Sequence, residues 1–155
     1  MNSLSQFIVK PLNGRYNNEV KVGDKKLITN TKVEDWRSVS KEAVIVSIPS
    51  AIKTDIKPGD KVILHHNIFR RWYDIRGAER NGSTFFKEDM YFASSDQIYM
   101  YKSNDTWIAN MQYCFVSPII ETDVLKNQKE RELVGILKYG NKSLEDAKIL
   151  PGDLI

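Results

Sequence analysis

Residues 41–65 read KEAVIVSIPSAIKTDIKPGDKVILH and carry the pattern that decides the fold. They contain two short runs rich in β-branched residues, Ala43–Ile48 and Lys61–His65, with the turn sequence KPGD directly before the second run. Short apolar runs bounded by Pro, Gly and Asp are typical of half-buried β-strands. This stretch therefore predicts two strands separated by a turn.

The same pattern recurs on both sides of this stretch. Helical periodicity is scarce, and residues 122–132 are expected to form either a short helix or an exposed loop. Many short strands separated by turn residues predict an all-β fold of the small barrel or sandwich type. The further strand candidates are Phe7–Leu12, Asp89–Phe92, Gln97–Tyr101, Trp107–Ala109, Tyr113–Val116 and Leu133–Lys138.

Composition excludes several classes of protein. The chain has 155 residues, and its 23 lysines and arginines exceed its 20 acidic residues by only three charges, which does not by itself predict a nucleic-acid or membrane partner. A single cysteine, Cys114, excludes an intrachain disulfide and a site of several thiolates. The first residues lack the pattern of a secretory signal, and no apolar run is long enough to span a bilayer. We therefore expect a cytoplasmic protein.

Three blocks of sequence occur twice in the same order, which predicts an internal repeat. We expect one complete unit at residues 1–103 and a partial second unit at residues 104–155. Because the last block stops early, we expect either a longer natural chain or a partial unit that pairs with another subunit. The blocks are FIVKPL at 7–12 and CFVSPI at 114–119, KEAVIVSIPS at 41–50 and RELVGILKYG at 131–140, and IKPGDKVI at 56–63 and ILPGDLI at 149–155.

Two segments interrupt the series of strands. Residues 21–40 are mostly polar around one apolar pair, Leu27-Ile28, and predict a long loop of the kind that is usually functional or disordered. An alternative is that this pair forms an ordinary strand, in a hairpin with Val20–Val22 that packs on the barrel. Residues 67–83 are rich in aromatic residues and arginines, which suit stacking on bases and binding of phosphates. Acidic residues in and beside this segment offset its charge, so packing and ion pairs are the competing interpretation.

Taken together, these features resemble the GroES-type co-chaperonin family, and among its members the lid proteins of some tailed bacteriophages. The resemblance rests on the opening FIVKPLNGR, the long loop with its apolar pair, the strand EAVIVSI, the turn IKPGDKVIL and the closing segment EDMYFASSDQIYMYK. It covers residues 7–102 as one unit and residues 113–155 as part of a second. It implies a small, partly open GroES-like β-barrel followed by a partial second copy. The long loop lacks the glycines usual in the family, and residues 48–56 leave no room for the hairpin that roofs bacterial members.

The resemblance implies a co-chaperonin, a ring-forming lid that binds an ATP-dependent chaperonin ring and encloses unfolded protein. The mobile loop would contact the chaperonin, and the first strand of one subunit would meet the last strand of the next to close a homo-oligomeric ring. No cofactor is implied, since ATP is used by the partner. The residues carried over are Lys25, Lys26, Leu27, Ile28 and Thr29 for the chaperonin contact, Phe7, Val9, Ile98 and Met100 for the subunit contact, and Phe69, Arg70, Arg71, Trp72 and Tyr73 for a loop facing the cavity or a neighbouring subunit.

Catalysis is not expected. His65 and His66 are neighbours at the end of a predicted strand, where successive side chains point to opposite faces, so they would not share a metal. No glycine-rich phosphate-binding motif occurs. Two alternatives to a co-chaperonin remain: a single-stranded nucleic-acid-binding barrel that uses residues 69–80, and a phage structural or assembly protein built on the same barrel.

Overall fold

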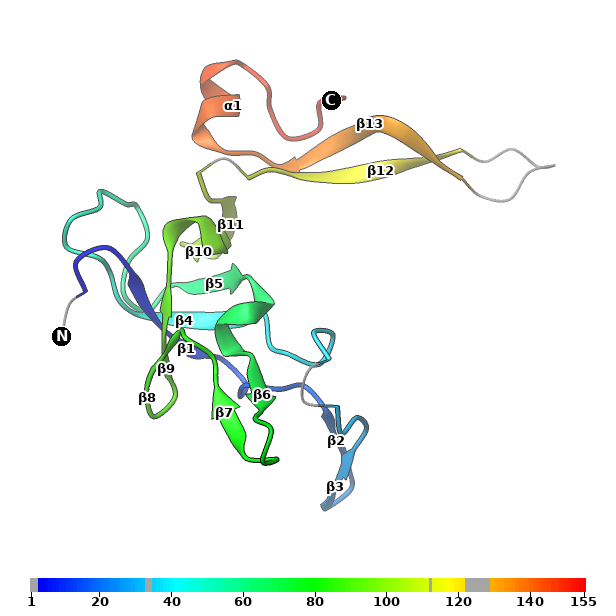
Figure 1. Ribbon diagram of the computed structural model, residues 1–155. Helices are drawn as coiled ribbons and strands as arrows, with labels where there is room; N and C mark the ends of the chain where they lie inside the picture. The colour runs from blue at the N-terminus through cyan, green and yellow to red at the C-terminus, as the bar shows by residue number, and fades with distance from the viewer. Residues whose placement is uncertain (1–2, 33–34, 112, 122–128) are drawn as a thin grey trace.

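The computed structural model describes residues 3–32, 35–111, 113–121 and 129–155, and it confirms the all-β prediction (Figure 1). Short 3-10 helices cover His66–Phe69 (η1) and Ser95–Gln97 (η2), and one short α-helix, α1, covers Lys142–Asp146. The strands are β1 (Phe7–Pro11), β2 (Glu19–Val22), β3 (Lys25–Ile28), β4 (Glu42–Ser47), β5 (Lys61–Leu64), β6 (Arg71–Tyr73), β7 (Glu79–Asn81), β8 (Phe85–Lys87), β9 (Met90–Ala93), β10 (Ile98–Ser103), β11 (Thr106–Ala109), β12 (Phe115–Glu121) and β13 (Lys129–Tyr139).

Seven strands form one antiparallel sheet in the order β11-β10-β5-β4-β1-β9-β8. Its two end strands, β11 and β8, are not hydrogen-bonded to each other in the described part of the chain. The sheet is therefore open at this pair of edges, and closure into a barrel stays a prediction.

The hydrophobic core lies against one face of this sheet. In β4, Ala43 and Ile45 are buried while Glu42 and Val46 are exposed, which is the alternation expected when one face of a strand meets the core. Buried residues from the connecting segments complete the core, and the ring of Phe69 meets the ring of Tyr91 edge to face at 4.9 Å. The connecting segments contribute Val39, Ile56, Ile68 and Phe69.

Two hairpins extend from the sheet, β2–β3 and β6–β7 (Figure 1). The prediction of a long loop at residues 21–40 is therefore wrong for its first part, because residues 21–28 lie in paired strands. Residues 33–34 of that segment lie outside the described residues. The alternative, a hairpin of Leu27-Ile28 with Val20–Val22, is confirmed by the strand pairing. Its packing on the barrel is wrong, since every residue of both strands is exposed.

The hairpin β12–β13 repeats the pairing of β1 with β4. Both copies also have an irregularity of register at the same place, between Ile8 and Val9 in the first copy and between Phe115 and Val116 in the second. This agreement supports the predicted repeat. The matching pairs are Ile8–Ser47, Val9–Ile45, Lys10–Val44 and Pro11–Ala43 in the first copy, and Phe115–Tyr139, Val116–Leu137, Ser117–Ile136 and Pro118–Gly135 in the second.

The turn sequence PGD is repeated together with its hydrogen bonds. In the first copy the amide of Gly59 donates to the carbonyl of Ile45 (2.8 Å), and the amide of Ile45 donates to the carbonyl of Asp60 (2.9 Å). Each turn places its glycine at a strongly positive φ, which glycine adopts at little cost. The equivalent donors and acceptors in the second copy are Gly152 to Leu137 (2.8 Å) and Leu137 to Asp153 (2.9 Å).

The structure corrects two details of the repeat. When the two copies are aligned by sequence, Val44 corresponds to Val134. The strand pairing instead makes Ile136, two residues later, the counterpart of Val44, because Val44 pairs with Lys10 and Ile136 pairs with Ser117. The predicted boundary at residue 103 divides a hairpin, because β11 pairs with β10 and belongs to the seven-stranded sheet.

Of residues 122–132, those from 122 to 128 lie outside the described residues, and the remainder belong to β13 rather than to a helix or loop.

The second copy is attached beside the end of the large sheet at β10 and β11 (Figure 1). The buried side chain of Asn110 donates from Nδ2 to the carbonyls of Ile98 (2.9 Å) and Ser95 (3.0 Å). Next to it, the hydroxyl of Tyr113 donates to the carbonyl of Asp96, and its ring meets that of Tyr99 at 5.0 Å. These polar and aromatic contacts fix where β12 begins.

Candidate functional site: two exposed hairpins

The hairpin β2–β3 presents apolar side chains to solvent. Val20 lies directly opposite Leu27, and side chains two residues apart share a face of a strand, so Val22 lies on the same face. Ile28 is opposite Glu19 and lies on the other face. Leu27 and Ile28 are each 58% exposed. The predicted apolar anchor is thus divided between two faces, and the larger apolar face combines Leu27 with two valines that the sequence analysis did not select.

Local sequence explains why this segment forms a hairpin. A two-residue turn, Gly23-Asp24, joins the strands, and Gly23 has a φ of +61°, the conformation that tight hairpin turns require at their first central residue. At the base of the hairpin, both the amide and the hydroxyl of Thr29 donate to the carbonyl of Asn18, at 2.8 and 3.0 Å. The alternating sequence Glu19–Val22 before Gly-Asp was the signal that would have predicted β2.

The two lysines of the predicted contact segment lie on different faces of the hairpin, and one of them borders the apolar face. Lys25 lies opposite Val22 and so shares the face of Leu27, whereas Lys26 lies on the other face and pairs with Glu19 at 3.0 Å. Both members of that ion pair are largely exposed, so it contributes little to stability. The hairpin therefore offers an apolar patch bordered by positive charge, which suits an apolar groove with acidic side chains at its rim.

The structure separates the residues of the predicted aromatic loop. Phe69 is fully buried in the core, so it cannot face a cavity or stack on a base. Trp72 and Tyr73 lie on β6 and are about half exposed, and Arg70 is exposed directly before that strand. Arg71 pairs with Glu79 of β7 at 2.9 Å and covers the ring of Tyr16 at 4.4 Å. The competing interpretation of packing and ion pairs accounts for Phe69 and Arg71.

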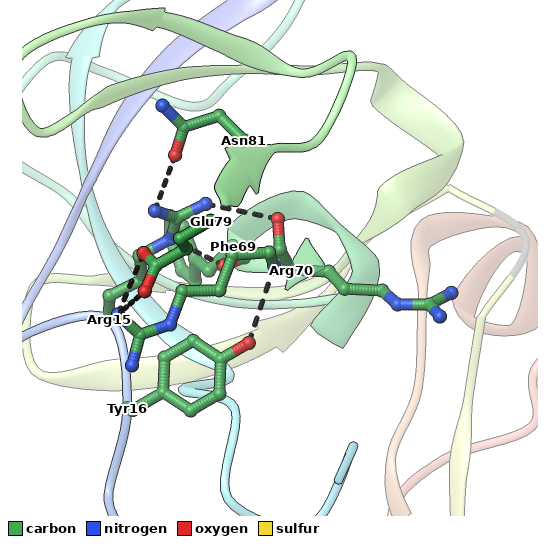
Figure 2. A network of polar contacts seen from close by, with 7 residues as sticks. Arg15, Tyr16, Phe69, Arg70, Glu79 and Asn81 are labelled. Carbon is green, nitrogen blue, oxygen red and sulfur yellow. Dashed lines mark hydrogen bonds and ion pairs between the residues drawn. The ribbon is translucent and has the colours of Figure 1, made fainter. Parts of the chain in front are cut away.

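Arg15 holds the base of this second hairpin (Figure 2). Its guanidinium donates to the carbonyls of Phe69 (2.6 Å) and Arg70 (3.0 Å) and to Oδ1 of Asn81 (2.6 Å), and it lies 5.2 Å from the centre of the Tyr91 ring. One side chain thus ties the segment before β2 to η1 and β7. The sequence shows Arg15 only as the residue after the Asn13-Gly14 turn, so no pattern marked it as a structural residue.

Asp74 organises the tip of the β6–β7 hairpin. Its Oδ1 accepts hydrogen bonds from the amides of Ala78 and Arg76, and its Oδ2 accepts one from Nε of Arg80, each at 2.9 Å. These bonds favour the ionised carboxylate, the one from the Ala78 amide most strongly, and they lower the pKa of Asp74. Ile75, between these polar residues, is completely exposed at the tip.

The four residues predicted for the subunit contact lie in the core. Phe7, Val9 and Ile98 have no exposed surface, and Met100 has almost none. The strands that carry them are not edges, because β1 lies between β4 and β9, and β10 lies between β5 and β11. A ring stays a prediction, but the surface for it would have to be found elsewhere, for example at the edge strands β8 and β11.

The two histidines depart from the expectation that they point to opposite faces. β5 ends at Leu64, so His66 begins η1 instead of continuing the strand, and the two imidazoles stack with centroids 4.3 Å apart. Burial, followed by the nearby His65, Lys41 and Arg70, lowers the pKa of His66. Among the residues that the structure describes, no group of three or more His, Cys, Asp or Glu side chains could hold a metal ion.

Comparison of the chain with protein-family models, with curated proteins and with solved structures found no match to any of the three. Within the described ranges, the helices are too short or too polar to cross a membrane.

Proposed function

We propose that this protein is a co-chaperonin, which binds a large ATP-dependent chaperonin ring through the β2–β3 hairpin and encloses unfolded protein. The observation that carries the proposal is the solvent-exposed apolar face of Val20, Val22 and Leu27 on a hairpin that makes no contribution to the core. An exposed apolar patch with a polar border is typical of a protein-binding surface. The resemblance of the sequence to the GroES-type family adds the identity of the partner.

The geometry suits repeated binding and release. One hairpin buries few side chains, so its affinity for a groove would be modest and its release fast. Several hairpins in a ring of subunits would bind together, because the first contact raises the effective concentration of the others. ATP turnover in the chaperonin would then reset the complex, so no nucleotide site is needed in this chain.

The division of Leu27 and Ile28 between two faces provides a matched pair of variants. Leu27→Asp places a charge on the face shared with Val20 and Val22, and we expect it to abolish co-sedimentation with a double-ring chaperonin in the presence of ATP. Ile28→Asp makes the same change at an equally exposed site on the other face, and we expect it to retain most of the binding. Both residues are outside the core, so the circular dichroism spectrum should not change.

Two results would contradict the proposal. Wild-type protein that neither co-sediments with the chaperonin nor alters its ATPase rate would remove the chaperonin as partner. Equal loss of binding in Leu27→Asp and Ile28→Asp would show that the apolar face is assigned wrongly.

The nucleic-acid alternative has weaker support in the second hairpin. Of the arginines on its two strands, Arg71 is paired with Glu79 and Arg80 with Asp74, so these guanidinium groups already have carboxylate partners. Trp72 and Tyr73 remain exposed for stacking. Binding of an oligonucleotide that weakens steeply with added salt would favour this alternative.

A further inference from the structure

The two copies of the repeat differ in what lies beside their first strand. In the first copy β9 pairs antiparallel with β1, and the register places Phe7 opposite Ala93 and Val9 opposite Tyr91. In the second copy β12 is the counterpart of β1 and pairs with β13 on one side, while no strand of the described residues pairs with its other edge. The second copy therefore has an open edge where the first has a strand.

The side chains at this edge are exposed, although their counterparts in the first copy are core residues. Val9 has no exposed surface, whereas its counterpart Val116 is 43% exposed. Phe7 is fully buried, whereas its counterpart Cys114 is exposed. The residue that corresponds to Val62 across the repeated PGD turn is Ile155, which is 38% exposed. In the second copy, the described residues therefore leave partly exposed the face that forms a core in the first copy.

Backbone hydrogen bonds show that the edge is oriented to accept a strand. In an antiparallel ladder the N–H and C=O of one residue point to the same side. Both groups of Leu137 are bonded to the segment after the PGD turn, to Asp153 and Gly152, so they point away from β12. Its partner Val116 must therefore direct its own N–H and C=O away from β13, to the open edge. Val9 has the same orientation in the first copy, where it meets β9.

The sequence of residues 114–120 limits how many residues of a new strand can pair with this edge, and it indicates that the new strand is uncharged where it pairs. Pro118 lacks an N–H, so a new ladder would end before it, just as β9 pairs only with residues 7–9 and not with Pro11. Residues 114–120, CFVSPII, carry no charge, and charges are one of the means by which exposed edge strands are normally protected. An uncharged strand of three or four paired residues would match this edge.

We propose that the open edge formed by Cys114 and the start of β12, residues 114–116, binds an extended strand from a partner polypeptide that is uncharged at its paired positions, antiparallel and in the register that β9 adopts on β1. The partner strand carries an aromatic residue opposite Val116, as Tyr91 is opposite Val9. Opposite Cys114 it accommodates a residue larger than Ala93, because cysteine is smaller than the phenylalanine it replaces. This mode of recognition is strand addition, in which main-chain hydrogen bonds provide affinity and alternate side chains provide specificity.

Cys114 is the only cysteine of the chain and allows the register to be tested directly. The probe is a synthetic peptide with the sequence of residues 88–96, EDMYFASSD, in which Ala93 is replaced by cysteine as its mixed disulfide with thionitrobenzoate. Thiol exchange forms the Cys114–peptide disulfide and releases one thionitrobenzoate anion, which is measured by absorbance. Directly opposed residues in such a pair have Cα atoms about 5.5 Å apart, within the range for a disulfide.

The matched control peptide carries the activated cysteine in place of Phe92, whose side chain lies on the opposite face of the strand. We expect exchange with the folded 155-residue protein to be at least about tenfold faster for the Ala93→Cys peptide than for the Phe92→Cys peptide, and the two rates to become equal in denaturant. The variant Val116→Arg, at a site that is already partly exposed, should remove the difference between the peptides.

Equal rates for both peptides with the folded protein would overturn the proposal. A protein that sediments as a dimer and protects Cys114 from a small thiol reagent would also overturn it, by assigning the edge to a second copy of this chain. The experiment contains no chaperonin, so its outcome is independent of the proposed function.

Discussion

Replacing Arg15 by methionine should destabilise the protein substantially, although Arg15 is neither in the core nor in a recognisable motif. The substitution keeps an unbranched side chain that reaches about as far as Nε of arginine, and it removes the guanidinium group with its three hydrogen bonds, to two carbonyls and to Asn81. Hydrogen bonds from charged groups contribute about 1.5–3 kcal/mol each, and the partial exposure of Arg15 reduces this to roughly 1 kcal/mol each. The carbonyl of Phe69, which belongs to a fully buried residue, would lose its bond to the guanidinium. We expect a loss of about 3 kcal/mol in the free energy of unfolding.

Urea denaturation followed by circular dichroism measures this loss as a lower midpoint with an unchanged m-value. For 155 residues the entropy of unfolding is about 0.33 kcal/mol/K, so the melting temperature should fall by roughly 9 °C. Arg15→Lys should lie between the wild type and Arg15→Met, because one ammonium cannot reach all three acceptors. Arg76→Gln, at the tip of β6–β7, is the control and should change the free energy by less than about 0.5 kcal/mol. A loss of under 0.5 kcal/mol in Arg15→Met would refute the structural role assigned to Arg15.

Two further predictions concern the second copy and the tip of the aromatic hairpin. In Gly135→Ala the new Cβ would lie 2.2 Å from Cγ1 of Val116 and 2.9 Å from the carbonyl oxygen of Ser117. Amide hydrogen exchange in β12–β13 should therefore accelerate by the equivalent of about 1–3 kcal/mol, while exchange in β1–β4 should not change. The second substitution Val116→Ala should partly restore the slow exchange, because it removes the Cγ1 atom that the new Cβ would meet. Unchanged hydrogen exchange in β12–β13 would show that the two strands can move apart to accept the new Cβ without loss of stability. Because the folded-state pKa of Asp74 is below its unfolded value, its contribution to the order of the hairpin tip is present above the unfolded pKa and is lost as the pH falls through the lowered one. The amide NMR signals of Arg76 and Ala78 should therefore shift on acidification in the wild type and show no such transition in Asp74→Asn.

Most strands were predictable because their evidence is local. Short apolar runs, rich in β-branched or aromatic residues and bounded by turn residues, located β1, β4, β5, β9 and β10 to within one or two residues. The β2–β3 hairpin was predicted only as the alternative to a long loop, for a physical reason: its valines and leucine are not buried, so the segment resembles a polar loop with a few apolar residues. The alternation of polar and apolar residues in Glu19–Val22 is only four residues long, the shortest run on which such a prediction depends.

The sequence indicated which segment contains the candidate site, but it did not show which side chains share a face of the hairpin. Leu27 and Ile28 are adjacent in the sequence and were predicted to act as one anchor, but neighbours on a strand point to opposite faces. Only the strand pairing shows that Leu27 shares its face with Val20. Phe69 and Trp72 looked equivalent within one aromatic segment. Tertiary structure separates them, because η1 turns Phe69 into the core before β6 leaves the sheet.

The sequence by itself determined that the chain is all-β and that its opening strands are repeated near its end, because both properties are written in residue patterns a few positions long. It also indicated that the PGD turn would recur, since glycine and aspartate at fixed spacing have the same local preferences in both copies. Only the tertiary structure decided which strands are edges. Strand neighbours come from distant parts of the chain. The burial of Phe7 and Val9 in a strand that pairs with β9, and the exposure of their counterparts Cys114 and Val116, therefore depend on pairing that no local pattern contains.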